Sequence, residues 1–192
     1  MARFNQSITT GEALTLDASV LPVVNVWSAS PKKVVQRYPQ YQVIVDTLRA
    51  MLSTKRFETL SISHQNFTRG AASCSDTGWH VDGRMNPDNP DEYALICFGA
   101  DGMRTMFHDR AITTDIPNSV INSPQSRATT FKTILEHDLH DESVGFEVPH
   151  ATPVAYTCFD FHKGRRITSA GQRLLIRLSV SDFIKPRPVK IR

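Results

Sequence analysis

From about residue 57 onward, the chain is a succession of short runs rich in β-branched and aromatic residues. Gly, Pro, Asn and Asp bound these runs, as is typical of strands joined by turns. The runs read FETLSISHQNF, EYALICFGA, MRTMF, VAYTCFDF and QRLLIRLSVSDF. This pattern leaves little room for a helical protein. It predicts a mainly β fold, an antiparallel sandwich or jelly roll, with helices packed against one sheet.

The N-terminal part predicts the flanking elements. VLPVVNVW (20–27) is the best strand candidate there. Ser30 followed by Pro31 is typical of a helix start, and Pro39 interrupts that helix. A second helical piece spans 41–52, because its apolar residues recur with helical spacing on one face. These residues are Val43, Ile44, Thr47, Leu48, Met51 and Leu52.

The 192 residues, about 40% of them hydrophobic and 21% charged, are ordinary for one soluble globular domain. We expect an N-terminal support (about 1–56), a β core (about 57–183) and a basic tail (184–192). Within the core, 116–143 reads as a loop and a short helix near 128–137, an insertion size that is often functional.

Charge, hydropathy and cysteine content limit the partners and the compartment. No stretch approaches 18 apolar residues, so we expect no membrane partner. The formal charge of +3 does not demand nucleic acid and does not exclude it. Cys74, Cys97 and Cys158 are an odd number without CxxC spacing, which favours a reducing compartment over a disulfide framework or a zinc site. With no signal-peptide core at the N-terminus, we expect a cytoplasmic protein.

The stretch Trp79–Gly83, WHVDG, is the first candidate for chemistry. On a strand, residues i and i+2 point to the same face about 6.6 Å apart, so His80 and Asp82 can converge on one metal ion. An HxD tripeptide alone is weak support, because it also arises by chance on a solvated strand. A third ligand is needed.

His162 is the preferred third ligand, because it ends a strand-like run and would point into the mouth of a sandwich. Two histidines and one carboxylate form the facial triad of non-haem Fe(II) oxygenases, which leaves coordination positions open. The competing histidines lie in less suitable places: a strand-like run, a strand end, the polar insertion and a loop. They are His64, His108, His137, His140 and His150.

Two arginines follow His162 on one face of the last predicted strand. Arg173 and Arg177 are separated by an even number of residues, whereas Leu174, Ile176 and Leu178 take the opposite face. Arginines on the inner face of an apolar strand are costly to desolvate without anionic partners. They therefore indicate a bound anion.

These motifs resemble those of the Fe(II)/2-oxoglutarate-dependent dioxygenases. The resemblance covers about residues 75–181 and rests on His80, Asp82, His162 and the stretch GQRLLIRLS. It implies a double-stranded β-helix (a jelly roll, cupin-like) that binds Fe(II), 2-oxoglutarate and O₂. The implied activity is hydroxylation of a substrate with release of succinate and CO₂.

The spacing is similar to that of the taurine dioxygenase branch. There, an arginine eleven residues after the distal histidine binds the cosubstrate, and a second follows four later; these offsets give Arg173 and Arg177. The segment GMRTMF matches a motif of that branch with its middle altered. The match implies that Thr105 helps to hold the carboxylate of that cosubstrate.

Arg177-Leu178-Ser179 fits the Arg-x-Ser pattern of another branch. Because the two Cα atoms lie about 13 Å apart on a strand, both cannot hold one carboxylate, and Arg173 is preferred. The other arginine then meets the substrate or the metal-side end of the cosubstrate.

Two alternatives stay open at this point. One is a facial-triad oxidase or oxygenase that does not use 2-oxoglutarate. The other is a non-catalytic β-sandwich binding module in which His80, Asp82 and His162 never meet. We expect a small-molecule or nucleotide-like substrate, with free amino acids, nucleobases, small acids and protein side chains as the open classes. The basic cluster of Lys163, Arg165 and Arg166 either attracts such an anion or forms a solvated turn.

Overall fold

The computed structural model is mainly β, with two antiparallel sheets and few helices. It describes residues 4–74, 78–113, 116–121, 134, 136–139 and 144–187. The strands are β1 (Thr9–Thr10), β2 (Val26–Ala29), β3 (Phe57–Phe67), β4 (Glu92–Gly99), β5 (Met106–Phe107), β6 (Phe146–Glu147), β7 (Val154–Thr157), β8 (His162–Lys163) and β9 (Gly171–Ser181). The helices are η1 (Ala18–Val20), α1 (Pro31–Arg37), η2 (Pro39–Tyr41), α2 (Gln42–Arg49) and α3 (Asn118–Ile121).

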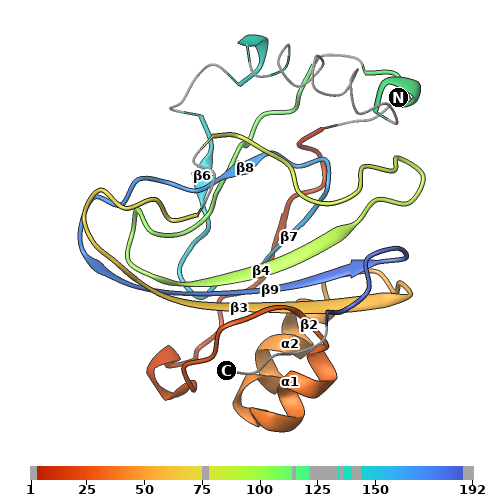
Figure 1. Cartoon of the computed structure of the whole chain (residues 1–192). Helices are drawn as coiled ribbons and strands as arrows, with labels where there is room; N and C mark the ends of the chain where they lie inside the picture. Colours follow the sequence, from red (N-terminus) through yellow and green to blue (C-terminus); the bar gives the residue numbers. More distant parts are fainter. Residues whose placement is uncertain are drawn as a thin grey trace.

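The two sheets differ in size. The larger has six strands in the order β1-β7-β4-β9-β3-β2, and the smaller has the order β6-β5-β8. The long strands β3 and β9 pair along their whole length, with Gln65 opposite Arg173 and Ser61 opposite Arg177. Figure 1 shows α1 and α2 on one side of the large sheet and β6 and β8 on the other. The mainly β fold predicted from the sequence is confirmed.

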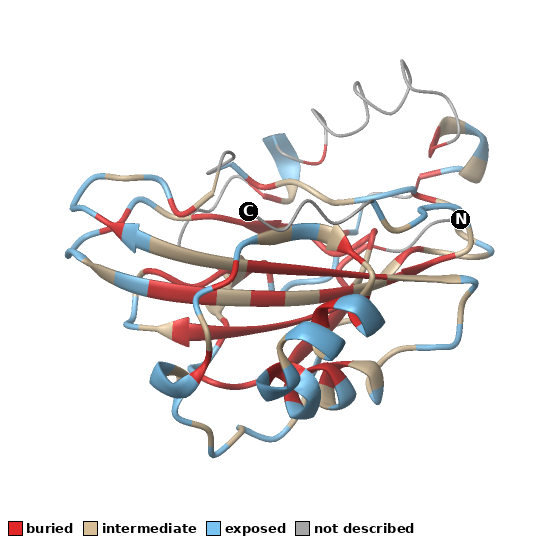
Figure 2. Ribbon diagram, turned by 60° about the horizontal axis from the view of Figure 1, so that its bottom comes forward, coloured by how far each residue is buried: buried red, intermediate tan, exposed pale blue. Residues whose placement is uncertain are grey.

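Two hydrophobic cores cover the two faces of the large sheet. On one face, α1 and α2 bury Val34, Ile44 and Leu48 against alternate residues of the sheet such as Ile62 and Ile176. The other core lies between the sheets and is rich in aromatic side chains, including Trp79, Tyr93, Phe107, Tyr156 and Phe161. Figure 2 shows buried residues along the sheet strands and exposed residues on the outer side of the helices.

The alternation along β9 sets which side chains face the space between the sheets. Leu174, Ile176 and Leu178 pack into the core beneath the helices, as predicted. Arg173 and Arg177 consequently face the opposite side, where they line a cavity. The two arginines face the space between the sheets because the apolar residues that alternate with them on β9 fill the core beneath the helices.

The N-terminal helices follow their sequence signals. Helix α1 begins at Pro31 with Ser30 as its N-cap, and it ends before Pro39. In α2, the buried residues are Ile44, Val45 and Leu48, whereas Val43 is 52% exposed. The prediction that Val43 belongs to the buried face is therefore wrong.

The strand predicted at 20–27 is mostly wrong, because only Val26–Ala29 forms β2. The residues before it are held by individual contacts instead of a strand ladder. The Asn25 side chain accepts a hydrogen bond from the backbone N–H of His64 (2.7 Å), and the Tyr41 hydroxyl donates to the carbonyl of Pro22 (2.7 Å). Hydrogen bonds to the Asn25 side chain and to the Pro22 carbonyl thus take the place of regular strand pairing in this run.

The insertion and the tail lie partly outside the described residues. Of 116–143, the short helix α3 is described, and residues 134, 136 and 137 are helical; most of the helix predicted near 128–137, and His140, lie outside. The basic tail is described as far as Arg187. No helix in the described part of the chain has the length and apolar character that crossing a bilayer requires.

Candidate metal and anion site

His80, Asp82 and His162 come together at the edge of the core between the sheets. One ligand atom from each lies within 4.8 Å of the others. His80 and His162 exchange two backbone hydrogen bonds of 2.9 Å in an isolated antiparallel bridge, which sets their rings 4.5 Å apart. Asp82 Oδ2 is 3.4 Å from His162 Nε2. The three side chains are therefore neighbours, as a shared metal site requires.

Backbone carbonyls orient both imidazole rings. His80 Nδ1 is 2.9 Å from the carbonyl of Gly78, and His162 Nδ1 is 3.1 Å from the carbonyl of Asp160. Because a carbonyl only accepts hydrogen bonds, these contacts favour the tautomer with the proton on Nδ1. Each Nε2 then carries the lone pair that a metal ion needs.

A tight turn after the HxD motif fixes Asp82. Gly83 has φ of +74°, and the N–H of Arg84 donates to Asp91 Oδ2 at 2.7 Å. A Cβ on Gly83 would lie 1.7 Å from the Tyr93 hydroxyl oxygen. Glycine is therefore required both by the backbone conformation and by the space.

Gly83→Ala is expected to destabilise the protein and to weaken metal binding, because the turn that aims Asp82 must shift. The matched control is Gly70→Ala, which has φ of +85° but no atom within 4 Å of the added Cβ. Gly70→Ala should lower the free energy of unfolding by about 1–2 kcal/mol, because only the backbone conformation is strained. Urea unfolding and Mn(II) titration compare the two variants. Equal losses of stability with unchanged metal affinity would contradict the role of the Gly83 turn.

Arg177 forms an ion pair with Asp82. Its guanidinium donates to Asp82 Oδ2, and its Cζ is 5.3 Å from the ring centroid of Trp27 and 5.4 Å from that of Tyr93. Burial by itself would raise the pKa of Asp82, but His162 and Arg177 more than offset this, so the pKa lies well below its usual value. The carboxylate is thus held ionised, the form that binds metal.

One cavity of about 280 Å³ joins the metal trio to both arginines. Its polar lining includes Gln65, Thr105 and Lys163, and the exposed Trp27 lies at its edge. Arg173, Arg177 and Thr105 therefore line the same cavity as the trio.

Arg173 differs from Arg177 in its partners. It is 4% exposed, and its hydrogen bonds go to the Gln65 side chain and to the backbone carbonyls of Ser73 and Met103. Its Nε is buried without a hydrogen-bond partner, and no carboxylate of the described residues pairs with it. Burial lowers the pKa of Arg173. A buried cation that has only neutral acceptors is suited to an incoming anion.

Sequence reasoning missed Gln65, Ser73 and Trp27. Gln65 sits opposite Arg173 in the β3–β9 register, on a strand whose cavity-facing positions are polar. That alternation of polar residues in SISHQ was a signal that the sequence contained. Ser73 lies in irregular backbone, where no periodicity points to the cavity. Trp27 lies in β2, whose register against β3 shifts between Val26 and Ala29.

Of the other described histidines, His137 is exposed, and the remaining three have hydrogen-bond contacts outside the trio. His64 is bonded to the Tyr41 hydroxyl (2.9 Å), His108 contacts Asn5 (3.0 Å), and His150 contacts the backbone of Gly99. The bulky residues near the motif, Trp79, Tyr93 and Phe161, are core side chains.

The basic cluster after His162 is divided by the fold. Lys163 is 6% exposed and lines the cavity, so it does not belong to a solvated turn. Arg165 pairs with Glu147, and Arg166 is exposed. Only one of these three cations therefore faces the site.

Comparisons with protein-family models, with curated proteins and with solved structures found no match. The described cysteines Cys74, Cys97 and Cys158 form no disulfide with one another. The site therefore has to be interpreted from its own geometry.

Proposed function

We propose that the chain is a non-haem oxygenase that depends on Fe(II) and 2-oxoglutarate and hydroxylates a small-molecule or nucleotide-like substrate, releasing succinate and CO₂. We further propose that its two sheets are those of a double-stranded β-helix, a cupin-like jelly roll. The observation that carries the proposal is the buried Arg173, which has no carboxylate partner among the described residues, in the cavity that the metal trio lines.

The residues fit the groups that this function requires. Two imidazoles and one carboxylate suit Fe(II) and leave positions free for other ligands. When bound, the iron supplies the centre at which 2-oxoglutarate and O₂ react. The chain itself holds Asp82 ionised, presents two Nε2 atoms and offers the Arg173 guanidinium to the far carboxylate of the cosubstrate. Thr105 can add a hydroxyl donor at the same end of the cavity.

The two arginines have separate roles in this proposal. Arg177 is engaged by the metal-ligand carboxylate of Asp82, so its charge is already compensated. Arg173 has no such partner among the described residues and is the residue for the cosubstrate. This assignment agrees with the preference from the spacing of the motif.

The experiment is an anaerobic titration of the Fe(II)-loaded protein with 2-oxoglutarate. Chelation is expected to give a visible metal-to-ligand charge-transfer band, and a succinate-release screen over metabolites and nucleotides then identifies the substrate. His80→Ala serves as the blank in both assays. Iron that binds without a band on adding 2-oxoglutarate would favour the oxygenase or oxidase that does not use this cosubstrate.

A further inference from the structure

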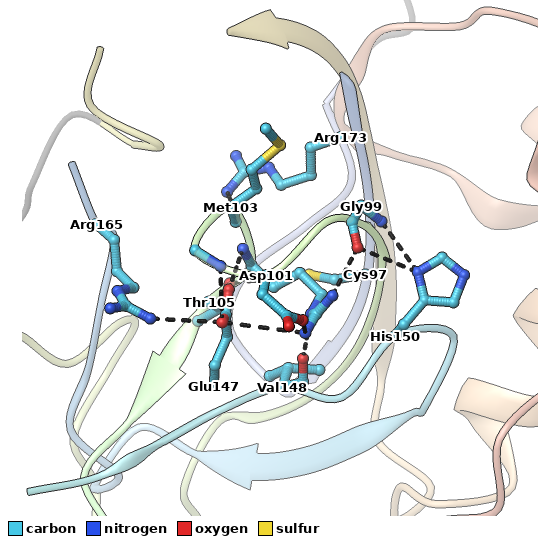
Figure 3. Close-up of polar contacts among 12 residues, drawn as sticks. Cys97, Gly99, Asp101, Met103, Thr105, Glu147, Val148, His150, Arg165 and Arg173 are labelled. Carbon is cyan, nitrogen blue, oxygen red and sulfur yellow. Dashed lines mark hydrogen bonds and ion pairs between the residues drawn. The ribbon is translucent and has the colours of Figure 1, made fainter. Parts of the chain in front are cut away.

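The loop between β4 and β5 forms the wall of the cavity at the Arg173 end. Its Met103 carbonyl accepts a hydrogen bond of 3.0 Å from Arg173 Nη1, and its Thr105 side chain lines the cavity. In Figure 3, Met103 and Arg173 lie together, with Thr105 and Glu147 on the adjoining side of the same loop. The position of this loop therefore determines how the guanidinium and the threonine are presented.

Glu147, on β6, holds the loop through its carboxylate. Oε2 accepts a hydrogen bond from the N–H of Gly102 (2.9 Å), and Oε1 accepts one from the N–H of Arg104 (2.8 Å). These two amides flank Met103. Gly102 has φ of +82°, a left-handed conformation that turns the loop toward the carboxylate. An ionised carboxylate that accepts two backbone N–H groups is a strong anchor.

Two arginines complete the anchor. Arg104 is buried and donates hydrogen bonds of 2.6 Å to the carbonyls of Val148 and Gly99 and to Asp101. Arg165 Nη1 is 3.4 Å from Glu147 Oε2 (Figure 3). Because Arg165 follows His162 by three residues, the network ties the loop to the segment that carries a metal ligand.

We infer that Glu147 is the positioning residue of the anion site: it sets the loop so that the Met103 carbonyl and Thr105 are aligned with Arg173. The inference rests on the proposed function, since 2-oxoglutarate is the anion in question. Glu147 acts through the backbone and is not among the residues that line the cavity. Removing the Glu147 carboxylate should therefore lower the affinity for 2-oxoglutarate and leave the affinity for the metal ion unchanged.

Glu147→Gln tests this inference. Glutamine keeps one carbonyl acceptor, but its amide NH₂ then faces a backbone N–H, and the charge that holds Arg165 is lost. We expect the Kd for 2-oxoglutarate, measured by anaerobic charge-transfer titration, to rise roughly 10- to 100-fold, the range for residues that orient a site from behind it. Mn(II) affinity should stay unchanged, and in turnover KM for 2-oxoglutarate should rise more than kcat falls.

The matched control is Glu58→Gln, which breaks a salt bridge to Arg49 away from the cavity and should change neither affinity. Arg165→Gln is the second variant, because its side chain is 40% exposed and its loss carries little risk to folding. It should raise the Kd roughly 2- to 5-fold, as a partly exposed ion pair contributes little.

The outcomes separate the inference from the proposed function. If the parent protein gives no band with 2-oxoglutarate, both are overturned. If the parent binds it and Glu147→Gln binds it with the same Kd, only the inference is overturned. Should Glu147→Gln fail to fold, an unchanged Kd in Arg165→Gln overturns the inference instead.

Discussion

Replacing Arg173 with methionine is expected to weaken 2-oxoglutarate binding strongly while the protein still binds Fe(II) or Mn(II). Arg173 is 4% exposed and has no carboxylate partner among the described residues, so the incoming carboxylate would be its only full counter-charge there. Truncating one partner of such a buried pair costs about 2–5 kcal/mol. The affinity should therefore fall roughly 30-fold or more. Methionine fills most of the volume and brings no charge.

Anaerobic titration measures the loss, with metal content as the internal check on the site. Arg166→Gln is the matched control, because it removes an exposed arginine from the same part of the chain and should leave the affinity unchanged. A variant at Arg173 that keeps the parent's affinity would show that another cation holds the anion. Lys163, which also lines the cavity, would then be the next candidate.

The sequence predicted the parts of the site that depend on strand periodicity. Arg173 and Arg177 face the cavity because Leu174, Ile176 and Leu178 are committed to the helix-side core, and this alternation is visible in the sequence. The strand expected for the HxD motif is absent: His80 forms only the isolated bridge to His162, and Asp82 lies in irregular backbone. His162 begins β8 and does not end the preceding strand, so the meeting of the three residues depends on a contact between distant segments.

Other parts depend on contacts between distant segments. The ion pair of Arg177 with Asp82 joins residues 95 positions apart, and only the folded geometry shows which arginine is compensated. In the sequence, nothing distinguishes Glu147 from other acidic residues. Its role is visible only in the fold, where β6 places it against the 100–105 loop. The strand expected at 20–27 failed for a related reason, because side-chain contacts to β3 and η2 replace its ladder.

Replacing Asp82 with alanine is expected to cause two separable losses. Removing one of three ligands should abolish metal binding. It also leaves the guanidinium of Arg177, whose side chain is 18% exposed, without its carboxylate. Breaking a fully buried pair costs about 3–5 kcal/mol; because Asp82 is 31% exposed, we expect about 2–3 kcal/mol here. Urea unfolding without metal and Mn(II) titration measure the two losses.

The double variant Asp82→Ala/Arg177→Met separates them. Removing the unpaired guanidinium of Arg177 should recover most of the lost free energy of unfolding, since an apolar side chain replaces a buried charge. Metal binding should stay absent, because no ligand has been restored. A double variant as unstable as the single one would mean that the ion pair does not stabilise the fold. Full metal affinity in Asp82→Ala would instead rule out Asp82 as a ligand. One carboxylate thus serves two partners, and each readout reports on only one of them.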